Sequence, residues 1–81
     1  MNVEVKLFAV AREVVGSDTV KLNLSDPATV RQLREALVER YPALSSTMRH
    51  MLVAVDAEYA GDDAQLTAKS EVALIPPVSG G

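Results

Sequence analysis

The chain has 81 residues, a net charge of −3, 48% hydrophobic residues and no cysteine. This length supports one small domain with its own core, and the lack of cysteine excludes disulfides, thiolate metal ligands and thiol nucleophiles. The acidic balance argues against nucleic-acid binding, and the lack of a long apolar stretch or a basic-then-apolar leader predicts a cytoplasmic protein that does not span a membrane.

The first part of the chain predicts an antiparallel hairpin. Residues 2–9 alternate between apolar and polar, which places Phe8 on the face opposite the core. A turn at 16–18 then leads into a second alternating strand that ends at Leu24. Two adjacent strands of this kind pair with each other, with room for a helical turn over 11–15.

A helix is predicted to begin at Val30. Thr29 and Gln32 have the spacing of a capping box, in which each residue satisfies a backbone N–H group of the other. Apolar residues recur at helical spacing as far as Tyr41, and Pro42 disfavours helical geometry at the residue before it. The helix therefore ends at that point.

The remaining third predicts a series of short elements. Residues 43–50 predict a loop with one helical turn, and the apolar run 51–55 predicts a strand buried on both faces. A turn then leads to a short edge segment around Tyr59, and Leu66 is predicted to reach the core from a short helical piece. Residues 71–75 predict the last strand.

This order of elements predicts an α+β protein with the β-grasp layout of ubiquitin. A mixed sheet of four to five strands would pack against one main helix, and the last strand would lie in the middle of the sheet beside the first. We expect a β-grasp domain over residues 1–77 and a flexible C-terminal carrier tail over 78–81.

The end of the sequence is its most informative feature. Pro76 and Pro77 fix φ and end the strand, so the chain should leave the domain in a set direction. Gly80 and Gly81 have no Cβ, and such a slim tail can thread a narrow channel and present its carboxylate inside another protein. The alternative is a glycine doublet at a frayed terminus without a function.

Three apolar residues are predicted to lie together at the root of this tail. Phe8 and Ile75 both face away from the core on neighbouring strands, and Tyr59 lies near them. We interpret the trio as a patch that binds partner proteins. The alternative is that Phe8 only covers the core under a loop.

Other candidate residues have simpler explanations. His50 is the only histidine and has no clustered ligands, so no metal site is expected. Asp62 and Asp63 follow a glycine and are interpreted as turn residues. Arg12 could contact a partner or form a surface ion pair, and Lys69 could lie near the exit of the tail and bind a partner carboxylate.

Three stretches resemble the small subunit of molybdopterin synthase, a family of ubiquitin-like sulfur carriers. They are residues 7–13 (LFAVARE) with Gly16, residues 53–55 (VAV) and residues 71–81 (EVALIPPVSGG). The resemblance in pattern and length covers essentially the whole chain, although 31–50 matches only in being a helix and a loop.

The resemblance implies a carrier subunit that is not itself a catalyst and binds no cofactor. Gly81 would be adenylated by an ATP-dependent enzyme related to ubiquitin-activating enzymes and converted to a thiocarboxylate with sulfur from a donor protein. The tail would then enter the large synthase subunit, in a heterotetramer of two carriers and two large subunits, and pass its sulfur to precursor Z (cyclic pyranopterin monophosphate). Besides the trio, the implied partner-binding residues are Pro76, Pro77, Val78 and Ser79, with Gly80 providing clearance.

Three other functions remain open on the sequence. The chain could carry sulfur for thiamine synthesis or transfer-RNA thiolation, although thiamine carriers tend to be shorter and the transfer-RNA carrier longer. It could be a ubiquitin-like modifier attached to lysines. It could also be a β-grasp binding module whose final glycines have no role.

Overall fold

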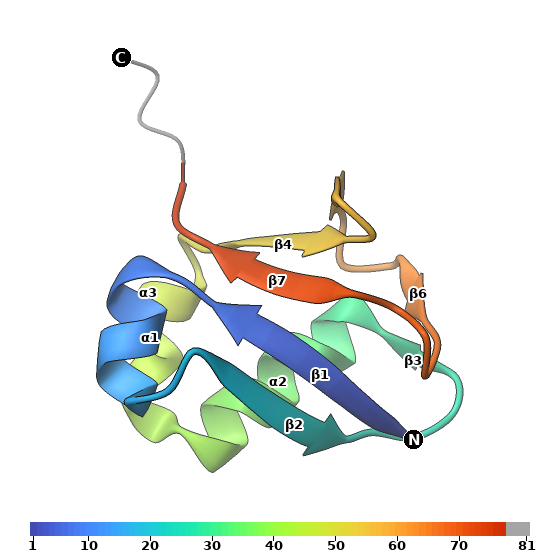
Figure 1. The fold of residues 1–81 in the computed structure, drawn as a ribbon, viewed down its shortest axis with the longest axis horizontal. Helices are drawn as coiled ribbons and strands as arrows, with labels where there is room; N and C mark the ends of the chain where they lie inside the picture. The colour runs from blue at the N-terminus through green and yellow to red at the C-terminus, as the bar shows by residue number, and fades with distance from the viewer. Residues whose placement is uncertain (78–81) are drawn as a thin grey trace.

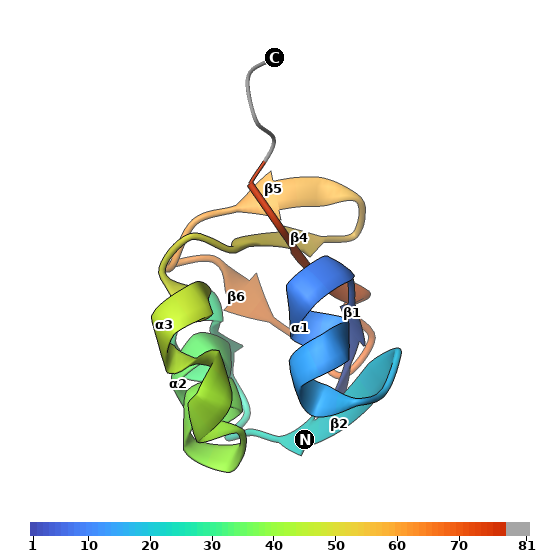
Figure 2. The same ribbon diagram turned by 90° about the vertical axis from the view of Figure 1, so that its left-hand side faces the viewer.

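The described part of the chain, residues 1–77 of a computed structural model, forms a mixed sheet with helices packed on one face (Figures 1 and 2). In chain order the elements are β1 (Asn2–Leu7), α1 (Ala9–Val15), β2 (Thr19–Asn23), β3 (Ala28–Thr29), α2 (Val30–Arg40), the 3-10 helix η1 (Pro42–Leu44), α3 (Ser45–Met48), β4 (Leu52–Val55), β5 (Glu58–Ala60), β6 (Gln65–Leu66) and β7 (Val72–Ile75). This is the predicted β-grasp architecture.

The main sheet has the strand order β2-β1-β7-β4-β5. β1 pairs with β2 in the antiparallel sense, as the alternating pattern predicted, and with β7 in the parallel sense. β7 also pairs with β4 and therefore lies in the middle of the sheet beside the first strand (Figure 1). The chain thus leaves the domain from an element that is held on both sides.

The capping box at the start of α2 is present as predicted. The Gln32 backbone N–H donates to Thr29 Oγ1 at 3.3 Å, and the Thr29 backbone N–H donates to Gln32 Oε1 at 2.8 Å. The helix ends before Tyr41, whose N–H donates to the Leu37 carbonyl at 2.8 Å. Pro42 then opens the short helix η1. The predicted loop with one helical turn is η1 followed by α3.

The core lies between the inner face of the sheet and α2. Val5, Leu7 and Leu74 from the sheet and Leu33 and Leu37 from α2 are at most 2% exposed. Within residues 1–77 the buried side chains are all hydrophobic, so burial of apolar surface is the main stabilising contribution. The core is extended under the sheet by three further buried residues: Leu44, Met48 and Met51.

β1 is shorter than the sequence predicted. It ends at Leu7, and the chain turns at Ala9, whose φ is 52°, to begin α1. Ala9 is therefore exposed instead of facing the core. Phe8 keeps an extended backbone, with φ −129° and ψ 157°, so it still points away from the core as predicted. Gly16 ends α1 with a φ of 80°, a conformation that glycine adopts without strain.

Two predictions for the later elements are wrong. The strand predicted over 51–55 is β4, but it is not buried on both faces as predicted. Leu52 is 36% exposed, because no helix covers the outer face of the sheet there. Leu66 reaches the core as predicted and is 1% exposed, but it lies in a strand, β6, which pairs with β3 in a separate two-stranded sheet. Strands of two residues show no alternation in the sequence, so neither was predicted.

Candidate functional site

A shallow hollow on the outer face of the sheet brings Phe8, Tyr59 and Ile75 together. The hollow has a volume of about 390 Å³. Phe8 lies between β1 and α1, Tyr59 lies on the edge strand β5, and Ile75 ends β7. Phe8 is 44% exposed and Tyr59 is 65% exposed, so Phe8 is not a core residue covered by a loop. The predicted clustering of the three residues is confirmed.

Small side chains in the middle of the sheet create this hollow. The strand register places Lys6 opposite Ala73, Ala73 opposite Ala54, and Ala54 opposite Tyr59. Directly opposed residues on neighbouring strands point to the same face, so these four form one row across the outer face. Because the two alanines are short, the surface between Lys6 and Tyr59 is depressed.

The hairpin that carries Tyr59 is held against the start of β7. Its two-residue turn places Asp56 and Ala57 at positive φ, 52° and 69°, as a type I′ turn requires. The Asp56 N–H donates to the Glu71 carbonyl at 2.8 Å, and the Glu71 N–H donates to Asp56 Oδ1 at 2.9 Å. This reciprocal pair fixes the position of β5 relative to the central strand.

The outer face of the sheet is charged at one end and apolar at the other. Near the start of β1, Glu4 lies opposite Lys21 on β2. Near the end of β7, Ile75 lies opposite the half-exposed Leu52, and Phe8 follows the end of β1. The apolar end is the one from which the chain leaves the sheet.

Two prolines follow β7 directly. Pro76 is half-buried and Pro77 is exposed, and neither has an N–H group with which to continue the strand. Proline also restricts φ to about −65°, so the direction in which the chain leaves Ile75 is constrained. The predicted carrier residues 78–81 lie outside the described residues.

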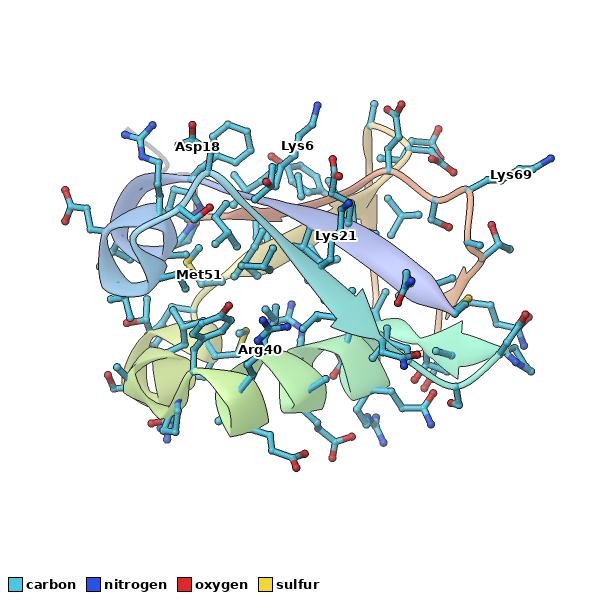
Figure 3. The ribbon with its side chains drawn as sticks, turned by 60° about the horizontal axis from the view of Figure 1, so that its bottom comes forward. Lys6, Asp18, Lys21, Arg40, Met51 and Lys69 are labelled. Carbon is cyan, nitrogen blue, oxygen red and sulfur yellow. The ribbon has the colours of Figure 1, made fainter. Side chains whose placement is uncertain are left out.

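Two basic residues singled out in the sequence lie away from the hollow that Tyr59 lines. Arg12 forms an exposed ion pair with Asp18, with 3.8 Å between Nη1 and Oδ1, which agrees with the surface-pair interpretation. Lys69 lies in the turn before β7, at the opposite end of that strand from Pro76 (Figure 3). The prediction that Lys69 lies near the exit of the tail is therefore wrong, because the chain enters β7 at one end and leaves it at the other.

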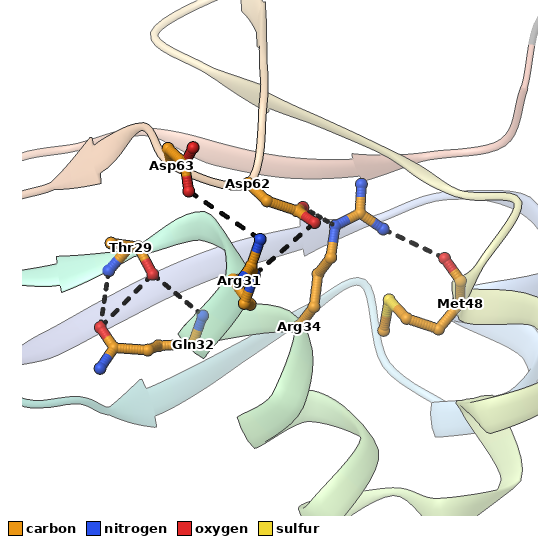
Figure 4. A network of polar contacts seen from close by, with 7 residues as sticks. All are labelled: Thr29, Arg31, Gln32, Arg34, Met48, Asp62 and Asp63. Atoms are coloured by element: carbon orange, nitrogen blue, oxygen red, sulfur yellow. Dashed lines mark hydrogen bonds and ion pairs between the residues drawn. The ribbon is translucent and has the colours of Figure 1, made fainter.

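Asp62 and Asp63 bind arginine side chains of α2 (Figure 4). Arg34 Nε lies 3.1 Å from Asp62 Oδ1 in an ion pair without hydrogen-bond alignment, and Arg34 Nη1 donates to the Met48 carbonyl at 3.1 Å. Arg31 lies 4.0 Å from Asp62 and 3.9 Å from Asp63. The two acidic residues are thus part of a loop, as predicted, and join it to the helix layer.

Replacing Arg34 by methionine is expected to lower the free energy of unfolding by about 1–3 kcal/mol. Asp62 and the Met48 carbonyl would each lose a partner, and the site is poorly accessible to water because the Arg34 side chain is only 21% exposed. Urea unfolding followed by circular dichroism measures this change. The matched control is Arg31→Met, whose side chain is 63% exposed and whose loss should cost less than about 1 kcal/mol. Equal losses for both variants would contradict a specific role for Arg34.

Residues 1–77 contain no group of three or more His, Cys, Asp or Glu side chains placed to hold a metal ion. No helix in the same range has the length and apolarity needed to cross a membrane. Of the residues that shape the hollow, Lys6, Ala54 and Ala73 were missed in the sequence. The alternation of residues 2–9 placed Lys6 on the same face as Phe8 but gave no reason to single it out, and alanines give no functional signal.

Comparison with known proteins assigns the chain to a family. The model of the ThiS family matches residues 5–81. Molybdopterin synthase sulfur carrier subunits are similar over the whole length: that of Caenorhabditis briggsae is 39% identical, covering 100% of this chain and 99% of its own, and that of Dictyostelium discoideum is 40% identical, covering 96% and 94%.

An archaeal relative is similar in both sequence and structure. Small archaeal modifier protein 1 of Haloferax volcanii is 41% identical, covering 96% of this chain and 99% of its own. The crystal structure of SAMP1 from the same organism matches with a TM-score of 0.87 and 39% identity, covering 100% of both chains. The resemblance stated from the sequence is confirmed, and this chain belongs to the ThiS family.

Proposed function

We propose that this chain is the sulfur-carrier subunit of a molybdopterin synthase. The observation that carries the proposal is the position of β7: the central strand delivers the end of the chain from the rim of an exposed apolar hollow. Relatives that bear this name are 39% and 40% identical over almost their full length.

The proposed chemistry takes place on the carboxylate of Gly81. A carboxylate oxygen attacks the α-phosphorus of ATP in the activating enzyme, pyrophosphate leaves, and the product is an acyl adenylate. The terminal sulfur of a persulfide on a donor protein then displaces AMP, which replaces the C–O bond to the nucleotide by a C–S bond in an acyl disulfide. A thiol cleaves the S–S bond and forms a disulfide with the donor sulfur, and a thiocarboxylate remains on the chain. Transfer of this sulfur to precursor Z, with water supplying the replacement oxygen, restores the carboxylate.

The hollow supplies the docking surface for this cycle. From Pro77, the tail reaches at most about 14 Å, so the domain must bind close to each active site. Burying an apolar side chain such as Phe8 contributes about 1.5–3 kcal/mol, and ordering each tail residue costs about 1–2 kcal/mol. The two amounts are comparable, so affinity for the large subunit depends on the apolar surface. Two carriers and two large subunits would form the complete enzyme, in the cytoplasm where ATP is available.

Replacing Phe8 by alanine is expected to weaken binding of the large subunit by at least about tenfold, because its side chain is exposed at the rim of the hollow and would be buried by the partner. Isothermal titration calorimetry with the purified large subunit measures the affinity. Urea unfolding is the control and should show a change of less than about 1 kcal/mol, since Phe8 is not part of the core. Unchanged affinity would remove Phe8 from the docking surface.

Intact mass spectrometry tests the proposed function. The chain is incubated with ATP, its activating enzyme and a sulfur donor, and the expected product has one oxygen of Gly81 replaced by sulfur. This product should then bind the large subunit and convert precursor Z. Attachment of the chain to lysines would instead support a modifier function, for which the name of the Haloferax volcanii relative is the supporting observation. An unchanged mass would overturn both.

A further inference from the structure

We propose that Lys6 selects a partner that presents a carboxylate to the hollow. This inference rests on the proposed function, because it concerns the surface that the large synthase subunit would cover. It adds a charged, specificity-determining contact to a surface that is otherwise apolar near the tail. The occupant it specifies is an apolar protein surface with one Asp or Glu side chain placed opposite Lys6.

The position of Lys6 supports this role. It lies on β1 opposite Ala73 of the central strand, and it lines the hollow together with Phe8 and Ile75. Its side chain points away from the helix layer (Figure 3). A partner that buries Phe8 and Ile75 must therefore also cover Lys6.

The charge of Lys6 has no close partner within residues 1–77. The ion pairs of this part of the chain involve only arginines, so no carboxylate oxygen of residues 1–77 lies within 4.0 Å of the Lys6 ammonium. Glu71 lines the hollow itself and, with Glu4, an adjacent hollow toward the charged end of the sheet. Asp18 lines a further hollow with Lys6 and Phe8, but its ion pair is with Arg12. Glu4 already faces Lys21 across β1 and β2.

Covering this surface without a carboxylate would carry a large penalty. Removing water from an ammonium group that stays unpaired is unfavourable, and this cost would cancel much of the gain from burying the apolar rim. A carboxylate on the partner offsets that cost through a charge-assisted hydrogen bond. Lys6 therefore favours partners that carry the acid and rejects apolar surfaces that do not.

Charge reversal at position 6 tests the inference. Calorimetry with the large subunit from the same organism should show at least about tenfold weaker binding for Lys6→Glu and a change within about threefold for Lys6→Arg. The matched control is Lys69→Glu, which changes the net charge equally but lies at the far end of β7 (Figure 3), and its affinity should stay within about twofold of the wild type. Urea unfolding of each variant confirms that the fold is retained.

A water-soluble carbodiimide, which joins an amine to a carboxylate in direct contact, identifies the partner group. We expect a cross-link between Lys6 and an Asp or Glu of the large subunit, located by peptide mass spectrometry, that is absent for Lys6→Arg. If the wild-type chain does not bind the large subunit, the proposed function fails. If the wild-type chain binds the large subunit but Lys6→Glu binds equally well, this inference is overturned. It is also overturned if Lys6→Met binds more tightly than the wild type, because Lys6 would then be paired with Glu71 or would lose its water without gaining a partner carboxylate.

Discussion

Deletion of Gly81 is expected to abolish formation of the thiocarboxylate while leaving the stability of the domain unchanged. The shortened chain ends about 3.5 Å earlier, so the carboxylate of Gly80 would stop short of the position at which the activating enzyme holds ATP. Misplacement by as little as 1 Å can reduce a rate by about 100-fold. Intact mass spectrometry after incubation with ATP, activating enzyme and sulfur donor measures the loss.

The control for this deletion is a measurement of folding. In the sequence, Gly81 comes after β7, the last strand of the described residues, so urea unfolding of the deletion variant should match that of the wild type. A second variant, Gly81→Val, keeps the length but adds a branched side chain, and it should be equally inactive if the terminus enters a narrow channel. Wild-type cofactor synthesis with either variant would overturn the carrier function.

Replacement of two neighbouring β7 residues by alanine is expected to have different effects: one replacement lowers the stability of the domain, and the other weakens partner binding. Leu74 is 0% exposed in the central strand, so Leu74→Ala should lower the free energy of unfolding by about 2–5 kcal/mol. Ile75 is half-buried on the outer face, so Ile75→Ala should cost about 1 kcal/mol or less. Its main effect should be weaker binding of the large subunit, by at least about tenfold.

The pair of variants separates folding from docking. Urea unfolding gives the stability of each, and calorimetry below the unfolding range gives the affinity for the large subunit. Leu74→Ala should bind with near wild-type affinity wherever it remains folded. If Ile75→Ala destabilised the domain as much as Leu74→Ala, Ile75 would be a core residue and would not belong to the docking surface.

The sequence predicts those features that rest on local patterns. Alternation placed Phe8 on the outer face, and the spacing of Thr29 and Gln32 gave the start of α2. Alternation also put Ile75 and Leu74 on opposite faces of the last strand, as found. Each of these depends on neighbouring residues alone, so no knowledge of the fold was needed.

Features that depend on distant parts of the chain were not predicted. The β3–β6 pair is formed by Ala28–Thr29 and Gln65–Leu66, which are too short to show a period. The early end of β1 depends on a positive φ at Ala9, although alanine has no preference for that conformation. The depth of the hollow depends on two alanines that become neighbours only through strand pairing, and Lys69 was misplaced for the same reason.

The hollow is assembled from residues near the beginning, the later part and the end of the chain: Phe8, Tyr59 and Ile75. It exists only when β7 has inserted between β1 and β4, a step that joins the first and last strands. A misfolded copy would carry the same final glycines but no surface for a partner to hold. Under the proposed function, ATP and sulfur would therefore be spent only on carriers whose sheet is complete.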